Sequence, residues 1–153
     1  MIALLQRVSQ ASVSVEGETV GEIGAGLMVL LGVERGDGFA QADRILERIL
    51  GYRVFADCEG RMNLSLRDTQ GGLLLVSQFT LAADTDKGMR PGFASAADPE
   101  QARACFEHLV GAARAQHAPV ATGRFGANMS VALVNEGPVT FRLRVPPDEA
   151  GRV

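Results

Sequence analysis

Apolar and polar residues alternate through the first 33 residues of the chain, as in the run Ala11-Ser12-Val13-Ser14-Val15. This two-residue period is typical of β-strands with one buried side and one solvent-facing side. Glycines at positions 17, 21, 24 and 26 interrupt the alternation at short intervals, as tight turns require. The segment predicts three strands joined by tight turns, so the fold has to include a β-sheet.

Two later segments have the period of an α-helix. In residues 39–51 the apolar side chains fall on one helical face, and charged residues point away from it. The second helix is expected to begin after Asp98, an N-cap acceptor, with Pro99 at the first helical position and Gln101 completing a capping box. Its apolar stripe consists of Ala102, Cys105, Phe106, Leu109, Val110 and Ala113. We expect both helices to pack on the sheet.

The remaining extended segments complete the predicted sheet. Residues 73–76 are wholly apolar, which predicts a central strand covered on both faces. Residues 53–56 and 62–66 are expected to be short extended pieces, and residues 129–134 and 139–145 to be two strands joined by a turn at 135–138. Two prolines then end the ordered part and leave a short polar tail at 148–153. The pattern predicts one α+β domain over residues 1–147.

Composition restricts the possible partners. Hydrophobic residues make up 46% of the chain and charged residues 22%, as in an ordinary soluble globule. The formal net charge is −3, so any contact with RNA has to be confined to one spot. Cys58 and Cys105 belong to no CxxC or Cys/His cluster, and the first apolar run is too short for a signal peptide or a membrane span. We therefore expect a cytoplasmic protein.

The motifs of nucleotide hydrolysis and dinucleotide binding are absent from the sequence, as are HExxH and GxSxG. His108 and His117 are nine residues apart, which places them on opposite faces of a helix. We expect both to be solvated and not to share a metal ion.

Polar residues follow the buried strand directly, in the order Ser77-Gln78-Phe79-Thr80. A polar group left without a partner there costs about 1–3 kcal/mol. These residues therefore either complete strand-end hydrogen bonds, the simpler interpretation, or form a site. A nucleophilic Thr80 would also require a base, and none is visible nearby in the sequence.

Three further segments are candidates for ligand contact, although each is also an ordinary loop. In residues 135–140, glycine next to proline lets backbone carbonyls approach a ligand without an intervening side chain. Residues 122–129 place small residues around Phe125. Lys87 and Arg90 are two local positive charges that either contact phosphates or solvate a turn.

Taken together, these segments closely resemble the bacterial D-aminoacyl-tRNA deacylase family, in which SQFTL is followed by GRFxAxM and NxGPVTF. They stand in this chain, in the same order, as SQFTLAAD, GRFGANM and NEGPVTF, and the resemblance runs from the opening MIALLQRV to Phe141. Asn128 and Gly92 stand where relatives often have an acidic residue and a serine. We expect these two departures to affect loop packing more than activity.

The resemblance implies a cytoplasmic homodimer with a strongly curved, barrel-like mixed sheet and two main helices packed on it. The implied reaction is hydrolysis of the ester between a D-amino acid and the terminal adenosine of tRNA, with glycyl-tRNA mischarged on tRNA-Ala as a further substrate. The implied partner is the aminoacylated acceptor end of tRNA. No metal, cofactor, DNA or membrane partner is expected.

The resemblance also implies the residues of the site. The pocket floor would be formed by Ser77, Gln78, Phe79 and Thr80, and the surroundings of the adenosine by Phe125, Gly126, Ala127 and Met129. A cis Gly137-Pro138 peptide, held in place by Arg7, would reach into the pocket of the partner subunit.

Carbonyl groups of Gly137 and Pro138 that face the α-carbon would accept the ammonium group of a D-residue and obstruct the side chain of an L-residue. The ester lies beside a free 2′-hydroxyl, so we expect substrate-assisted hydrolysis with Thr80 as a positioning group and backbone N–H groups near Phe79 as oxyanion donors.

Two alternative functions stay open. One is a non-catalytic RNA-binding or oligomerisation module of the same fold, and the other is a small-molecule esterase without an RNA partner.

Overall fold

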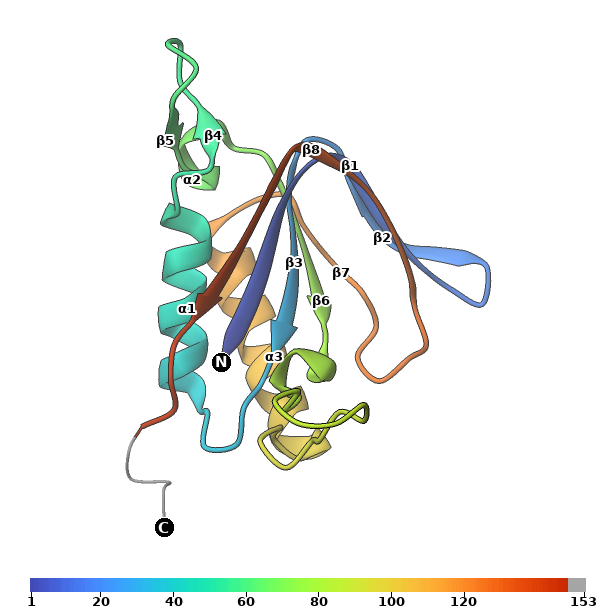
Figure 1. Ribbon diagram of the computed structural model, residues 1–153. Helices are drawn as coiled ribbons and strands as arrows, with labels where there is room; N and C mark the ends of the chain where they lie inside the picture. The colour runs from blue at the N-terminus through green and yellow to red at the C-terminus, as the bar shows by residue number, and fades with distance from the viewer. Residues whose placement is uncertain (149–153) are drawn as a thin grey trace.

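The computed structural model describes residues 1–148, so the predicted tail beyond Asp148 lies outside the described residues. The chain begins with the predicted meander of β1 (Ile2–Val15), β2 (Glu18–Ile23) and β3 (Gly26–Gly32). β3 and β2 pair with the first and second parts of β1, and β8 (Ser130–Arg144) pairs with β1 along nearly its whole length. β1 is therefore the long strand on which three others assemble (Figure 1).

The second part of the sheet is parallel. β6 (Gly72–Ser77) pairs with β3 on one side and with β7 (Val120–Thr122), a strand that was not predicted, on the other. Leu73 and Leu75 pack into the core on one face of the sheet, while Leu74 and Val76 pack into a second cluster on the opposite face. The expectation of an interior strand covered on both faces is confirmed.

The sheet curves until its two ends meet. The strand order is β2-β1-β3-β6-β7, yet Gly21 of β2 lies against Thr122 of β7. A Cβ atom at position 21 would lie 2.3 Å from the carbonyl oxygen of Thr122, so only glycine permits this approach. The contact nearly closes a barrel, and the predicted curved, barrel-like mixed sheet is confirmed.

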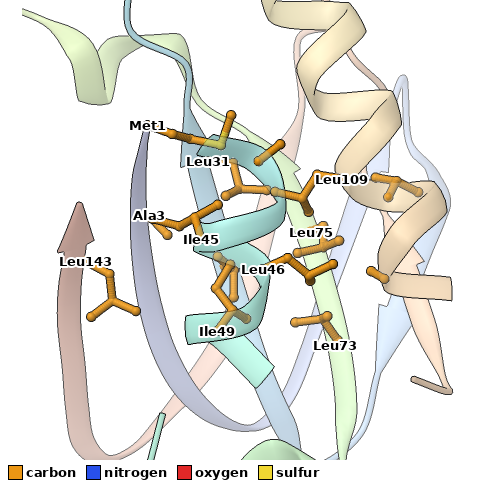
Figure 2. Packing of buried hydrophobic residues seen from close by; sticks show 14 of the residues in the cluster. Met1, Ala3, Leu31, Ile45, Leu46, Ile49, Leu73, Leu75, Leu109 and Leu143 are labelled. Atoms are coloured by element: carbon orange, nitrogen blue, oxygen red, sulfur yellow. The ribbon is translucent and has the colours of Figure 1, made fainter. Parts of the chain in front are cut away.

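Two helices, α1 (Phe39–Gly51) and α3 (Pro99–Gln116), lie on one face of the sheet (Figure 1). Ile45, Leu46 and Ile49 of α1 point toward the core that the strands line with Leu73 and Leu75 (Figure 2). Burying a side chain of this size stabilises the fold by about 1.5–3 kcal/mol. The buried residues of α3 are Ala102, Cys105, Phe106, Leu109, Val110 and Ala113, as the stripe predicts.

The start of α3 differs from the prediction in one detail. The Asp98 carboxylate accepts hydrogen bonds from the backbone N–H groups of Glu100 and Gln101, as expected of an N-cap. The Gln101 side chain does not complete a capping box, because its amide donates to the backbone carbonyl of Asp37 at 2.8 Å. The interaction joins the start of α3 to the loop that precedes α1.

The predicted turn at residues 135–138 is wrong. Both halves of β8 pair with β1 in the same direction, so the chain does not reverse between them. Asn135 lies opposite Val8 and Thr140 opposite Gln6, and residues 136–139 bulge out of the strand opposite Arg7 alone. Glycine and proline indicate an interruption of the ladder correctly, but here the interruption is a bulge.

The smaller elements lie outside the main sheet. β4 (Phe55–Ala56) and β5 (Met62–Leu64) form a separate two-stranded hairpin, and α2 (Leu66–Thr69) and the 3-10 helix η1 (Phe79–Ala82) are single turns. Within residues 1–148, no helix combines the length and the apolar character needed to cross a membrane.

A buried polar cluster holds one end of the sheet together. The α-amino group of Met1 lies 3.1 Å from Glu34 and 2.7 Å from Asp37, and Glu34 also accepts three hydrogen bonds from Arg144. Burial alone would raise the pKa of Glu34, but the hydrogen bonds from Arg144 and the α-amino group lower it overall. Burial dominates at Asp37 and raises its pKa. Val33, which directly precedes Glu34, joins this cluster to the loop before α3, because its carbonyl accepts a hydrogen bond from the N–H of Ala97 at 3.0 Å.

Candidate active site

A pocket lies at the carboxyl ends of the parallel strands β3, β6 and β7, and α3 forms one of its walls. Ligands in α/β sheets commonly bind at such an edge, because several strands end there together and loops replace them. The pocket volume is about 460 Å³, which suits a ligand the size of a nucleoside. Its lining includes seven of the residues singled out from the sequence, namely Ser77, Gln78, Phe79, Phe125, Gly126, Ala127 and Met129.

The end of β6 forms one side of the pocket. The N–H of Gln78 donates to the Leu31 carbonyl at 2.7 Å, and the chain then leaves the sheet and enters η1. This turn exposes Phe79, whose side chain lines the pocket while 59% of its surface stays open to solvent.

Thr80 is not part of the pocket lining. It is exposed on η1, and its hydroxyl accepts a hydrogen bond from the side-chain amide of Gln78. Among residues 1–148 this amide is the only side chain that hydrogen-bonds to the hydroxyl, and an amide N–H cannot act as a base. The backbone N–H groups of Phe79 and Thr80 open η1, where no carbonyl of the helix itself can accept from them.

The segment after β7 forms the opposite side. The N–H of Gly123 donates to Leu75 at 3.0 Å, which continues the β6–β7 pairing to the pocket edge. Phe125 then packs against Phe106 of α3, with 5.9 Å between ring centroids, and the guanidinium carbon of Arg103 lies 4.7 Å from the Phe125 ring centroid. Gly126 follows with a φ of +78°, a left-handed conformation that turns the chain back over the pocket.

Gly137, Pro138 and Arg7 lie apart from this pocket. The Gly137-Pro138 peptide is cis and exposed, in the bulge of β8. Arg7 connects the bulge to the rest of the fold, because its guanidinium donates to the Glu136 carbonyl at 3.3 Å and to the Val54 carbonyl at 2.8 Å. Arg7 pairs with Leu27 at the opposite end of β3 from the pocket residue Leu31, and four residues of strand span about 13 Å. The bulge therefore does not line the pocket of its own chain.

Sequence reasoning missed several pocket residues. Ala102 and Phe106 were assigned to the core of α3, and they also form the pocket wall. The apolar stripe of α3 showed that both side chains point inward, but a stripe does not show which of its residues face a cavity. Asn128, which was expected to affect loop packing more than activity, also lines the pocket. The other lining residues that were missed are Leu31, Val33, Val76, Ala97, Pro99 and Val131.

Neither histidine contributes to the pocket. His108 is partly exposed, stacks on Phe39 with 4.2 Å between ring centroids and lies 2.7 Å from Asp43. The expectation of a solvated His117 is wrong, because this residue is buried and its Nε2 lies 2.6 Å from the Gly71 carbonyl oxygen. Within the described part of the chain, no three histidine, cysteine or acidic side chains gather in a group that could hold a metal ion.

The comparisons with known proteins agree with one another. The family model described as D-Tyr-tRNA(Tyr) deacylase matches residues 4–144. The D-aminoacyl-tRNA deacylase of Methylococcus capsulatus is 67% identical over 97% of both chains, and that of Thioalkalivibrio sulfidiphilus is 69% identical over 96% of this chain and 99% of its own.

Solved structures have the same fold. The structure titled c-Myc DNA Unwinding Element Binding Protein is 40% identical, covers 95% of this chain and 99% of its own, and superposes with a TM-score of 0.91. A probable eukaryotic D-amino acid tRNA deacylase, 19% identical, covers 93% of this chain and 98% of its own with a TM-score of 0.72, and supports the fold alone. On the family model and the identities of its relatives, the chain belongs to the D-aminoacyl-tRNA deacylase family.

Proposed function

We propose that this protein hydrolyses the ester bond between a D-amino acid and the 3′-terminal adenosine of tRNA. The observation that carries the proposal is that residues 77–79 and 125–129, which belong to two of the segments that carry the family resemblance, line one pocket of about 460 Å³. In the reaction, water bonds to the carbonyl carbon, the bond from that carbon to the ribose oxygen breaks, and the ribose oxygen takes a proton. The products are a free D-amino acid and tRNA.

The pocket has two parts in this proposal. Phe125 and residues 126–129 surround the adenosine, because an aromatic ring and a glycine-containing turn provide a flat apolar surface and close backbone approach. Ser77, Gln78 and Phe79 hold the aminoacyl end at the carboxyl edge of β6.

The chemistry is assisted by the substrate. No base contacts the Thr80 hydroxyl within residues 1–148, whereas the ester carries its own 2′-hydroxyl next to the reacting carbonyl. The N–H groups of Phe79 and Thr80 can stabilise the developing oxyanion, an effect worth about 10²–10³ in rate per donor in other enzymes. Thr80 acts as a positioning residue, holding the Gln78 side chain through their hydrogen bond.

Replacing Thr80 with alanine tests this assignment. We expect kcat to fall by less than about tenfold, because the lost hydroxyl positions Gln78 and does not attack the ester. The measurement is single-turnover deacylation of D-aminoacyl-tRNA, with Thr19→Ala, an exposed threonine on β2, as the matched control. A fall to the uncatalysed rate in a folded Thr80→Ala protein would assign Thr80 as the nucleophile instead.

Chiral selection comes from a second copy of the chain. The bulge with Gly137 and Pro138 is exposed, rigidly held by Arg7 and remote from its own pocket, which suits a loop that serves the pocket of the partner subunit. This arrangement requires a homodimer with a two-fold interface. Fixed carbonyls facing the α-carbon accept the ammonium group of a D-residue and exclude an L-side chain. Rejection by about 10⁴ requires about 5.5 kcal/mol, which one clash and one desolvated carbonyl supply.

Glycine passes the same barrier, because only hydrogen faces the carbonyls. The proposal therefore includes glycyl-tRNA mischarged on tRNA-Ala as a substrate. Its macromolecular partner is the acceptor end of tRNA, a cytoplasmic molecule, which places the enzyme in the cytoplasm.

Deacylation of tRNA charged with D- or L-tyrosine tests the proposed function directly. We expect kcat/KM for the D-ester to exceed that for the L-ester by about 10⁴. Absence of turnover on both esters would favour a non-catalytic module of the same fold. Equal turnover of a simple aminoacyl ester and the tRNA ester would favour a small-molecule esterase.

A further inference from the structure

A loop at the mouth of the pocket is fixed by hydrogen bonds at its base, but it has no role in the reaction proposed above. Residues 84–93, named here the rim loop, follow η1 and lead toward α3. The N–H of Asp84 donates to the Gly92 carbonyl at 2.7 Å and the N–H of Gly92 donates back at 2.9 Å, which closes the loop at its base. The Ser95 hydroxyl, just beyond it, donates to the Ala82 carbonyl at 2.6 Å. These hydrogen bonds hold the base of the loop in place, independently of the conformation of its tip.

The loop carries cationic and apolar side chains that the fold itself does not use, at its tip (residues 87–90) and at Phe93, which follows the Asp84–Gly92 base. Lys87 and Arg90 are exposed, and within residues 1–148 neither forms an ion pair. Met89 is fully exposed, and 41% of Phe93 is exposed. Residues 84–93 also include Asp84 and Asp86, so the loop is formally neutral. Lys87 and Arg90 pair with neither carboxylate, so beside the exposed apolar surface they are the groups of this loop that can contact an anion with an apolar part.

The rim loop continues the surface of the pocket. The ring of Phe93 lies against the ring of Phe79, with 5.2 Å between centroids and 50° between planes. Phe79 lines the pocket and is itself 59% exposed. Aromatic surface therefore extends without a break from the pocket to the rim loop.

We propose that the rim loop binds the single-stranded acceptor end of tRNA just before its terminal adenosine, with a base stacked on Phe93 and phosphates paired with Lys87 and Arg90. The inference rests on the proposed function, since it extends the occupant of the pocket by one or two nucleotides. Proteins bind single-stranded RNA through this combination of aromatic platforms for bases and cations along the backbone. A nucleic acid also explains why cations, and not apolar residues alone, stand at the tip.

The test compares a substrate that reaches the rim loop with one that does not. Deacylation is measured on D-tyrosyl-tRNA and on the D-tyrosyl ester of adenosine, which fills the pocket alone. For Phe93→Ala we expect kcat/KM to fall about tenfold on tRNA and less than twofold on the adenosine ester, because stacking on one base is lost. Phe93→Tyr keeps the ring and is expected to restore the wild-type value.

Salt dependence tests the two cations separately. For the double variant Lys87→Ala/Arg90→Ala we expect the slope of log(kcat/KM) against log[salt] on tRNA to become shallower by about 1.4, which is two phosphates at about 0.7 each. The matched control is Arg61→Ala/Arg114→Ala, which removes two exposed cations far from the loop and is expected to leave the slope unchanged.

Several outcomes would overturn the inference without touching the proposed function. Equal losses on both substrates for Phe93→Ala would show that Phe93 acts only through Phe79. An unchanged salt slope in the double variant, or loss of dimerisation in either variant, would assign the rim loop to another role. If the wild-type protein hydrolyses neither substrate, the proposed function fails. Binding of a fluorescein-labelled ACCA oligonucleotide, lost in Phe93→Ala, would then still support the rim loop as an RNA site, and equal binding would reject it.

Discussion

Replacing Gly137 with alanine is expected to lower the ratio of D- to L-deacylation rates by a hundredfold or more. Gly137 has a φ of +125°, and a Cβ atom there would lie 2.7 Å from Val139 Cγ2 and 3.1 Å from the guanidinium of Arg7. The bulge must therefore shift, and its carbonyls leave the position from which they obstruct L-residues. A hundredfold loss corresponds to about 2.8 kcal/mol, roughly half of the discrimination proposed for the wild type. The measurement is kcat/KM for both esters of tRNA.

Gly17→Ala is the matched control for this variant. Gly17 also has a positive φ, +80°, but nothing lies within 4 Å of its Cβ position. Gly17→Ala therefore also strains the backbone but does not move the bulge, and its D/L ratio should equal that of the wild type. An unchanged ratio in a folded Gly137→Ala protein would contradict the assignment of chiral selection to this loop.

Mixing two variants shows which subunit supplies the loop. A Gly137→Ala protomer has an altered loop and an intact pocket. An Ala127→Trp protomer has an intact loop, but an indole blocks its pocket. If the loop serves the partner subunit, heterodimers regain one site in which an intact pocket meets an intact loop, and chiral selection returns in the mixture. Selection that does not return, in a mixture shown to contain heterodimers, would place the loop in its own subunit.

Gly26→Ala is expected to have the largest effect on stability, lowering the free energy of unfolding by more than about 4 kcal/mol or preventing folding. Gly26 pairs with Gly72 at the start of the parallel β3–β6 ladder. A Cβ atom at position 26 would lie 1.9 Å from the Gly72 carbonyl oxygen and 2.6 Å from its nitrogen. These are backbone atoms of the neighbouring strand, so the clash can be relieved only by separating β3 and β6 at this end of the ladder. Urea unfolding followed by circular dichroism measures the change.

Gly24→Ala, two residues earlier in the same turn, is its control. Nothing lies within 4 Å of the Cβ position of Gly24, so the expected change is within about 1 kcal/mol. Both variants are compared at one protein concentration, because assembly contributes to the stability of an oligomer. Equal midpoints for the two variants would show that β3 and β6 can separate at little cost.

The helices were predictable because their signals are local. The apolar face of α1 and the cap and stripe of α3 lie within one or two turns of the chain, and the predicted residues are the buried ones. His117 shows that a local period does not predict residues beyond the end of a helix. It was placed by continuing the helical period, but α3 ends at Gln116 and His117 is the extended C-cap, with φ −148° and ψ 153°. Outside the helix, its side chain turns inward to Gly71.

Long-range pairing could not be predicted in the same way. Glycine and proline at 137 and 138 indicate an interruption, and a turn and a bulge have the same local signal. Pairing with β1 across more than 120 residues of chain decides between them, because it keeps both halves of β8 running in one direction. Asn128 illustrates the same limit at the site, since its place in the pocket depends on α3 and β3 as well as on its own segment.

The amino-acid sequence by itself determined the two long helices, most of the strands, the interior position of residues 73–76 and the motifs that carry the family resemblance. Those properties depend on neighbours along the chain, where period, caps and turn residues act directly. Period, caps and turn residues could not bring residues 77–79 and 125–129 together. The family resemblance implied a shared site, and the tertiary structure decided that both segments line one pocket and that the Gly137-Pro138 bulge stands away from it. The physical reason is that parallel strands align their carboxyl ends through crossovers, so chain segments far apart in sequence meet only once the sheet has formed.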